Sequence, residues 1–294
     1  MNDIQNKSIT IEDINQLKLP SVSTLMKEHV KRNIFLYVIL PILYVVLYFL
    51  ILNYYFQLKN IINDNVYVVI FLAILPTLIL YAFLYNKENK EFFTSFAKQL
   101  GFSFSPKGDI LSVDGMLFKT GRSQSIHNII NGLYYNHPTR FYNFETVIGY
   151  GKSRHTESFK VLEVTFDTLL PEIILSRKFG IFSDMTISRD NEKRLSLEGD
   201  FDKYFNLYTI GGYENEVLQI FTPEIMKMFI DDTKELNVEM FGSRMYIYSR
   251  SFSADMDGLI KFYNFGKDVI INLDQKLKSL KDDVSAMEKY IKLT

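Results

Sequence analysis

The residues with the greatest chemical potential form a short run, Gly151-Lys152-Ser153. Such a run ends a phosphate-binding Walker loop only when a glycine stands five residues before the Gly-Lys pair and a helix follows. Position 146 is a threonine, and residues 154–166 have the pattern of a loop followed by a strand. We therefore interpret residues 151–153 as the tip of a β-hairpin rather than a nucleotide site.

Other catalytic arrangements are also incomplete. The chain has no cysteine, and therefore no thiol nucleophile or thiolate metal ligand. It has no Gly-x-Ser-x-Gly elbow. Glu145 and Glu163 lie on candidate neighbouring strands and could form a carboxylate pair, but strand alternation favours two solvent-facing residues. None of the histidines stands at zinc-ligand spacing from carboxylates: His29, His127, His137 and His155. The sequence thus predicts a non-catalytic protein with no cofactor, and it assigns no catalytic or metal-binding residue.

Composition narrows the functional classes further. Hydrophobic residues make up 47% and charged residues 23% of the 294 positions, which excludes an intrinsically disordered chain. The formal net charge of −1 argues against nucleic-acid binding, which normally requires a basic field. A few basic residues near the predicted hairpin could touch lipid headgroups, although scattered basic loop residues are common: Arg140, Lys152, Arg154 and His155.

Two uncharged apolar runs dominate the first third of the chain. A bilayer core is about 30 Å thick and requires roughly 20 apolar helical residues. Ile34–Phe56 and Val66–Tyr85 meet this length, and we interpret them as a transmembrane hairpin rather than a pair of buried core helices. Each run contains a proline, Pro41 or Pro76, which a membrane helix tolerates as a kink. No ionisable residue lies inside either run, which favours an anchor over an ion pathway.

Basic residues flank the two runs, whereas the connection between them carries only Lys59. Because flanking positive charge stays in the cytosol, we expect a multi-pass protein of the cytoplasmic membrane with both termini cytosolic. The first apolar run is too long and starts too late for a cleavable signal peptide. The flanking residues are Lys18, Lys27, Lys31 and Arg32 before the hairpin, and Lys87, Lys90 and Lys98 after it.

The remaining chain predicts an α+β domain with an antiparallel sheet and segregated helices. The clearest β signal is Phe141–Tyr150 followed by Phe159–Thr168, with alternating apolar residues. Thr222-Pro223-Glu224 is typical of a helix start. Thr10 with Asp13 predicts a short helix near the N-terminus. Other expected elements are a helix at 88–100 and strands at 102–105, 110–118, 217–220, 238–241 and 244–249. The polar segment at 123–131 is ambiguous, and a helix is one interpretation of it.

A heptad pattern runs from Leu259 to Ile291, with Gly266 as its weak point. One interpretation is a coiled coil with a second copy or another membrane-associated protein. The other is that residues up to about 273 pack on their own domain and only the rest is exposed. Both remain open. The candidate interaction residues are Leu273, Leu277, Leu280, Val284, Met287 and Ile291.

Several stretches together resemble a group of uncharacterised bacterial integral membrane proteins with two spans and a cytosolic α+β domain. The resemblance covers roughly residues 30–250, and Phe221-Thr222-Pro223-Glu224-Ile225-Met226 is its most specific part. It implies topology and supplies no activity. The other stretches are 92–104, 144–149, 170–172, 197–201 and 205–208.

These observations lead to one favoured reading and one alternative. We expect a cytosolic N-terminal segment at 1–33, the hairpin at 34–86, the α+β domain at 87–254 and a C-terminal helix at 255–294. The favoured function is a membrane-anchored scaffold that binds the lipid bilayer and self-associates or binds a partner protein through the C-terminal helix. The alternative is a membrane-tethered small-ligand sensor or enzyme with a site beside the 141–168 hairpin.

Overall fold

The structure is a computed structural model that describes residues 8–56, 61–178, 192–197, 199–210, 212–232, 236–250 and 256–291. The chain divides into two compact units. The helical unit is Lys18–Phe96, and the sheet unit combines the residues up to Leu17 with those from Ala97 onward. The sheet unit is therefore built from both sides of the helical unit in the sequence. The four-part division expected above stays a prediction.

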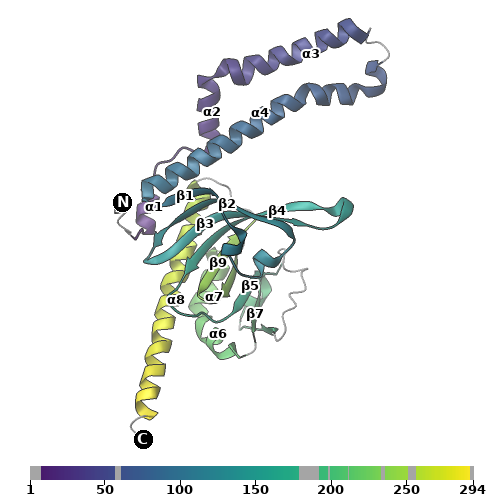
Figure 1. The fold of residues 1–294 in the computed structure, drawn as a ribbon. Helices are drawn as coiled ribbons and strands as arrows, with labels where there is room; N and C mark the ends of the chain where they lie inside the picture. The colour runs from purple at the N-terminus through teal and green to yellow at the C-terminus, as the bar shows by residue number, and fades with distance from the viewer. Residues whose placement is uncertain are drawn as a thin grey trace. The chain divides into compact units, whose positions relative to one another are not determined.

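The helical unit contains α2 (Val22–Arg32), a π-helical turn η1 (Phe35–Ile39), α3 (Leu40–Phe56) and most of α4 (Ile61–Leu100) (Figure 1). The side chain of Ser21 begins α2 by accepting a hydrogen bond from the Thr24 amide at 3.2 Å. The sequence predicted separate helices at 66–85 and 88–100, but α4 is continuous. This separation was wrong because no glycine or proline lies between Thr77 and Leu100 to end the helix.

The sheet unit holds a nine-stranded antiparallel sheet within the described residues, in the order β1-β2-β3-β4-β9-β8-β5-β7-β6. The predicted α+β class, with an antiparallel sheet, segregated helices and a long C-terminal helix, is confirmed. The strands are β1 (Ser103–Lys107), β2 (Arg122–Tyr134), β3 (His137–Ile148), β4 (His155–Thr165), β5 (Ile173–Arg177), β6 (Glu192–Leu195), β7 (Phe205–Ile210), β8 (Asn237–Phe241) and β9 (Arg244–Ser249).

The predicted hairpin of residues 141–168 is confirmed as β3 and β4, which pair from Thr139 with Val164 to Ile148 with His155. Residues 123–131, for which a helix was one interpretation, belong to the neighbouring strand β2 instead. Ser123 and Asn128 have φ angles of 53° and 54°, and the β2–β3 register shifts beside each of them. These irregularities break the two-residue alternation and explain why the sequence pattern concealed the strand.

Two other predicted strands are wrong. Residues 110–118 form the 3₁₀ turns η2 (Ile110–Ser112) and η3 (Leu117–Lys119) instead. The Asp109 carboxylate accepts the Leu111 amide at 2.9 Å, and the Leu111 side chain is 88% exposed. Residues 217–220 belong to the helix α6 (Glu214–Ile220), where Val217 and Ile220 are buried at helical spacing.

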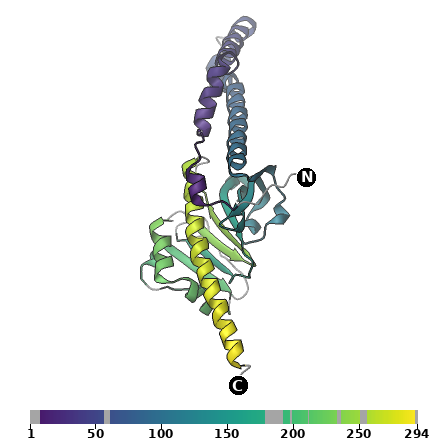
Figure 2. The same ribbon diagram turned by 90° about the vertical axis from the view of Figure 1, so that its left-hand side faces the viewer.

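The helix α8 (Met256–Ile291) packs along one face of the sheet, together with α7 (Pro223–Asp232) (Figure 2). The Phe262 ring lies 5.6 Å from that of Phe141 on β3, and Phe229 of α7 lies 5.2 Å from Phe265. Gly266, the weak point of the heptad pattern, does not interrupt α8, which is continuous across it. A Cβ atom at this position would lie 2.6 Å from Leu162 Cδ2, so the glycine lets α8 approach β4 closely.

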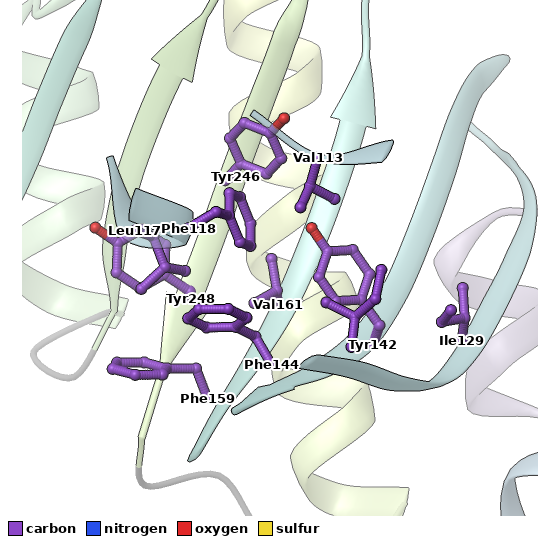
Figure 3. Packing of buried hydrophobic residues seen from close by; sticks show 11 residues of the cluster. Val113, Leu117, Phe118, Ile129, Tyr142, Phe144, Phe159, Val161, Tyr246 and Tyr248 are labelled. Carbon is purple, nitrogen blue, oxygen red and sulfur yellow. The ribbon is translucent and has the colours of Figure 1, made fainter. Parts of the chain in front are cut away.

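The opposite face is covered by residues 109–120, which we call the strap. Leu117 and Phe118 of the strap pack on Tyr142, Phe144 and Tyr246 (Figure 3). The Phe118 ring lies 5.1 Å from both Phe144 and Tyr246. Each fully buried aromatic side chain of this kind stabilises the fold by roughly 1.5–3 kcal/mol. The strap thus closes a second core layer over β3, β4 and β9.

The residues before the helical unit complete the same sheet unit. Ile9 forms a parallel bridge with Tyr134 at the end of β2. Its amide donates to the Leu133 carbonyl at 2.8 Å, and its carbonyl accepts from the Tyr135 amide at 3.0 Å. The short helix that Thr10 and Asp13 predict is present as α1 (Ile11–Asn15). It packs on α8.

Candidate functional site

The helical unit carries an unusual amount of exposed apolar surface. Phe35 is 62% exposed and Phe83 is 64% exposed. Exposed residues occur at consecutive positions along η1 and α3, so this surface runs around the helix and is not confined to one face. A water-soluble helix has one apolar stripe and one polar face. Further exposed residues are Leu40, Ile42, Leu43, Val46, Leu47, Leu50 and Ile51 on α3, and Phe71, Ile74, Leu78, Ile79 and Tyr81 on α4.

The two prolines line a shared apolar groove of about 600 Å³ between α3 and α4. Pro41 lacks an amide proton, and the helix before it widens so that the Leu40 amide bonds the Phe35 carbonyl five residues back. Pro76 lies inside α4, and the following Thr77 hydroxyl donates to the Ile74 carbonyl at 2.6 Å. The two prolines that the sequence marks as kinking residues therefore line the same groove. The full lining is Leu40, Pro41, Tyr44, Pro76, Thr77, Ile79, Leu80 and Phe83.

Among the described residues, no single helix has both the length and the apolar composition of a membrane span. One pair of helices is long and apolar enough for a span when its members are taken together: Val22–Arg32 and Phe35–Ile51. The chain bends by 94° between the two helices.

A buried polar cluster ties α2 to α4 at the base of the helical unit. His29 Nδ1 lies 2.8 Å from Glu88 Oε1, and the Tyr37 hydroxyl lies 3.3 Å from His29 Nε2. His29 is 8% exposed and Glu88 is 2% exposed. Among the described residues, no donor meets Glu88 Oε1 in hydrogen-bond geometry, so the imidazole contact is short but poorly aligned. Because polar groups are costly to bury without a polar neighbour, this cluster favours keeping α2 against α4.

Sequence reasoning missed this cluster. His29 was considered only as a zinc ligand, and Glu88 only as the first residue of a helix. The available signal was that Glu88 is the first acidic residue after the second apolar run. The basic residues expected to flank the membrane are exposed in the structure, and their position beside a bilayer stays a prediction: Lys27, Lys31, Arg32, Lys87 and Lys90.

The candidate interaction residues of the C-terminal helix fall into two groups. Leu273 is buried, and its neighbours along the seam from Leu259 to Ile270 pack inside the sheet unit, so this part does not form an intermolecular coiled coil. Leu277 is half-buried. The helical backbone continues to Ile291, but the remaining side chains lie outside the described set: Leu280, Val284, Met287 and Ile291.

Glu163 is buried, which corrects the expectation of a solvent-facing carboxylate. Its Oε2 accepts from the Tyr142 hydroxyl at 3.1 Å and lies 3.4 Å from Arg140 Nη1. Arg244 Nη1 lies 3.7 Å from Oε1 and donates to the Ser112 carbonyl of the strap at 2.7 Å. Burial raises the pKa of Glu163, against the opposing effect of the two guanidinium groups and the tyrosine. The cluster therefore fastens the strap to the sheet.

A second buried carboxylate, Glu239, was not singled out in the sequence. It stands opposite Tyr246 in the β8–β9 register and accepts the amides of Met116 and Leu117. Tyr246 is in turn opposite Glu163. Glu239 therefore binds the strap directly, whereas Glu163 acts through Arg140 and Arg244, which donate to Ser112. A charged residue in the apolar β8 strand was the available signal.

The structure does not bring Glu145 and Glu163 together, since they lie on opposite faces of the sheet. Arg140 is the cross-strand partner of Glu163, and Glu145, five residues further along β3, points the other way. Glu145 lies 3.5 Å from His127 Nε2. On the same face, Lys160 Nζ donates to Asn143 Oδ1 at 2.6 Å. Burial lowers the pKa of Lys160 to about 8, against an opposing effect of Glu145.

The remaining sequence candidates are placed as follows. Gly151–Ser153 form a 3₁₀ turn between β3 and β4, which confirms the hairpin-tip interpretation. His155 contacts Glu157 at 2.9 Å, and His137 contacts Asp274 of α8 at 2.8 Å. Within the described ranges, no three acidic or histidine residues are grouped as a metal site.

Few known proteins are similar to this chain. No family model and no curated protein matches the chain. One solved structure, the mycobacterial trehalose monomycolate transport factor A, TtfA, aligns over 60% of this chain and 93% of its own, with a TM-score of 0.44 and 8% identity. A likeness at this level carries no argument about function.

Proposed function

We propose that the chain is a membrane-anchored, non-catalytic scaffold in which the apolar helices of the helical unit lie in lipid. The observation that carries this proposal is the exposed apolar surface around α3 and along α4. Contiguous patches larger than a few hundred Å² are rarely left in water. Lipid covers such a surface on all sides and leaves the helical backbone satisfied.

The folding of residues on both sides of the helical unit into one sheet unit supports an even number of crossings. Ile9 precedes the apolar helices, and its backbone partners Leu133 and Tyr135 follow them. Segments that share backbone hydrogen bonds must lie on the same side of a bilayer. A single crossing would separate Ile9 from β2, whereas the predicted two-span hairpin keeps them together.

The exposed basic residues support the cytosolic placement of that unit. Lys31 and Arg32 close α2, and Lys87 and Lys90 follow the apolar part of α4. Lysines and arginines near span ends remain in the cytosol. The proposed topology is therefore a cytoplasmic-membrane protein with both termini and the sheet unit in the cytosol.

The end of α8 supplies the proposed contact surface. In both views the helix continues past the edge of the sheet (Figures 1 and 2), and its heptad pattern continues to Ile291. An amphipathic helix beyond its own domain can bury its stripe only against another helix. We propose self-association through Leu277, Leu280, Val284, Met287 and Ile291.

The alternative, a sensor or enzyme beside the 141–168 hairpin, finds less support. On the strap side, the space next to β3 and β4 is filled by Val113, Leu117 and Phe118 (Figure 3). The polar residues there are engaged in holding the strap.

The absence of cysteine from the sequence allows a clean test of the topology. We would introduce single cysteines as Lys18→Cys, Lys59→Cys and Lys152→Cys and label intact cells with a membrane-impermeant maleimide. Only Lys59→Cys should react, and all three should react after the cells are permeabilised. Labelling of Lys18→Cys or Lys152→Cys in intact cells would contradict the orientation. Release of the full-length chain from membranes by alkaline carbonate would contradict the anchor itself.

A further inference from the structure

The β3–β4 hairpin projects beyond its neighbour β9. Strand β9 pairs only with residues 160–165 of β4, and β3 pairs with β4 as far as Ile148 and His155. Figure 1 shows this end of the hairpin reaching away from the rest of the sheet. We call residues 146–156 together with Arg122, which pairs with Val147, the finger.

The finger is strongly basic in a chain whose net charge is −1. Arg122, Lys152, Arg154 and His155 are exposed, and residues 146–156 contain no aspartate or glutamate. The next carboxylate along β4, Glu157, is already engaged by Arg250 at 2.8 Å and His155 at 2.9 Å. No carboxylate within residues 146–156 neutralises Arg122, Lys152 or Arg154, whereas His155 is paired with Glu157.

An exposed aromatic ring stands among these cations. Tyr150 is 77% exposed, and the Arg122 guanidinium lies 3.8 Å from its ring centroid. The turn that presents the ring is tightly built. Gly149 has a φ of 82°, and a Cβ atom there would lie 2.4 Å from the Ser153 carbonyl oxygen. The Ser153 amide closes the turn on the Tyr150 carbonyl at 3.1 Å. The sequence thus holds Tyr150 outward on an ordered turn.

We infer that the finger binds the anionic lipid headgroups of a membrane surface. Arginine and lysine near an anionic leaflet are attracted to its phosphates, and tyrosine favours the headgroup level because its ring is apolar and its hydroxyl is polar. The finger combines both features within one turn. A projecting tip can contact a flat, phosphate-rich surface, whereas a small soluble ligand would require a concave pocket. This inference rests on the proposed function, because the finger can contact a membrane only if the chain is anchored in one.

The test uses the full chain with Tyr150→Trp, which introduces the sole tryptophan of the sequence. The protein is reconstituted into vesicles of phosphatidylcholine alone or of phosphatidylcholine with phosphatidylglycerol. Flotation first shows whether the chain is anchored, so failure of the proposed function is recognised separately. With phosphatidylglycerol, emission should shift to shorter wavelength and iodide quenching should fall. Added salt should reverse both changes because surface charge is screened.

Two charge variants carrying the same reporter complete the design. Replacing Arg122, Lys152 and Arg154 by glutamine should lower the partition of the finger onto anionic lipid by roughly 100-fold. The matched control replaces three exposed lysines elsewhere, Lys107, Lys227 and Lys261, and should keep the shift. Equal emission in the two vesicle types, or loss of the shift in the control alone, would overturn the inference. A shift with soluble polyglutamate but not with phosphatidylglycerol would assign the finger to an acidic protein and would also overturn it.

Discussion

Gly266 of α8 lies against Leu162 of β4 so closely that a Cβ atom on the glycine would stand 2.6 Å from Leu162 Cδ2. Leu162 is fully buried, so its side chain has little room to move. Glycine in a helix interior costs about 1 kcal/mol relative to alanine. The close approach of α8 and β4 explains why a glycine is retained in the interior of α8 despite this cost.

The first prediction follows from this contact. Gly266→Ala gains helix propensity but overpacks the core, which typically costs 1–3 kcal/mol. We expect a net loss of about 1 kcal/mol, measured as a lower melting temperature in detergent. Adding Leu162→Val should restore part of the loss by making room. A higher melting temperature for Gly266→Ala alone would show that the contact relaxes freely.

The second prediction concerns the pH dependence of stability. Burial raises the pKa of Glu163 above its ordinary value of 4.5, so the folded state favours the neutral carboxyl. This stabilisation is complete below pH 4.5 and is lost as the pH rises through the folded-state pKa. Melting temperatures of the native chain should therefore fall over this window relative to Glu163→Gln. A constant difference for Glu163→Gln would contradict the raised pKa.

The third prediction addresses Lys160. Its pKa is lowered to about 8 by burial and is partly restored by Glu145. After ¹³C-dimethylation, the Lys160 resonance, identified by its loss in Lys160→Arg, should titrate near pH 8. Glu145→Gln should lower that midpoint further because the favourable negative charge is removed. A midpoint that does not move would mean that Glu145 has no effect on Lys160.

The fourth prediction tests pairing through the end of α8. Leu277→Asp combined with Leu280→Asp places two charges in the proposed seam and should reduce crosslinked dimer in native membranes by roughly tenfold. Gln275→Asp with Ser279→Asp adds the same charge outside the seam and serves as the control. Equal crosslinking in both double variants would mean that α8 does not pair in this way.

Much of the fold could be predicted because β3 and β4 follow strict alternation. Residues such as Tyr142, Phe144 and Val161 all face the strap, and the turn between the strands is marked by Gly149 and Gly151. The regions that failed were those where tertiary contacts decide the local structure. Val217 to Ile220 has β-forming residue types but buries two side chains at helical spacing.

The polar clusters were harder to predict because their partners are distant in the sequence. Glu163 alternates like a surface residue, and only its register neighbours Arg140 and Tyr246 show that it is buried. The His29–Glu88 pair likewise joins residues from either side of both apolar runs. These pairings could not be predicted from one sequence. Alternation along a strand indicates which face of the sheet a residue occupies, but it does not indicate which element packs on that face.

The backbone bridge between Ile9 and the end of β2 also determines when the sheet unit can fold during translation. The ribosome releases the N-terminal segment long before it makes Leu133 and Tyr135, whose backbones Ile9 requires. In the proposed topology, the apolar helices enter the translocon during this interval. The sheet unit can close only after insertion is finished, so a nascent chain stalled before Tyr135 should leave Ile9, Ile11 and Ile14 accessible to cytosolic chaperones.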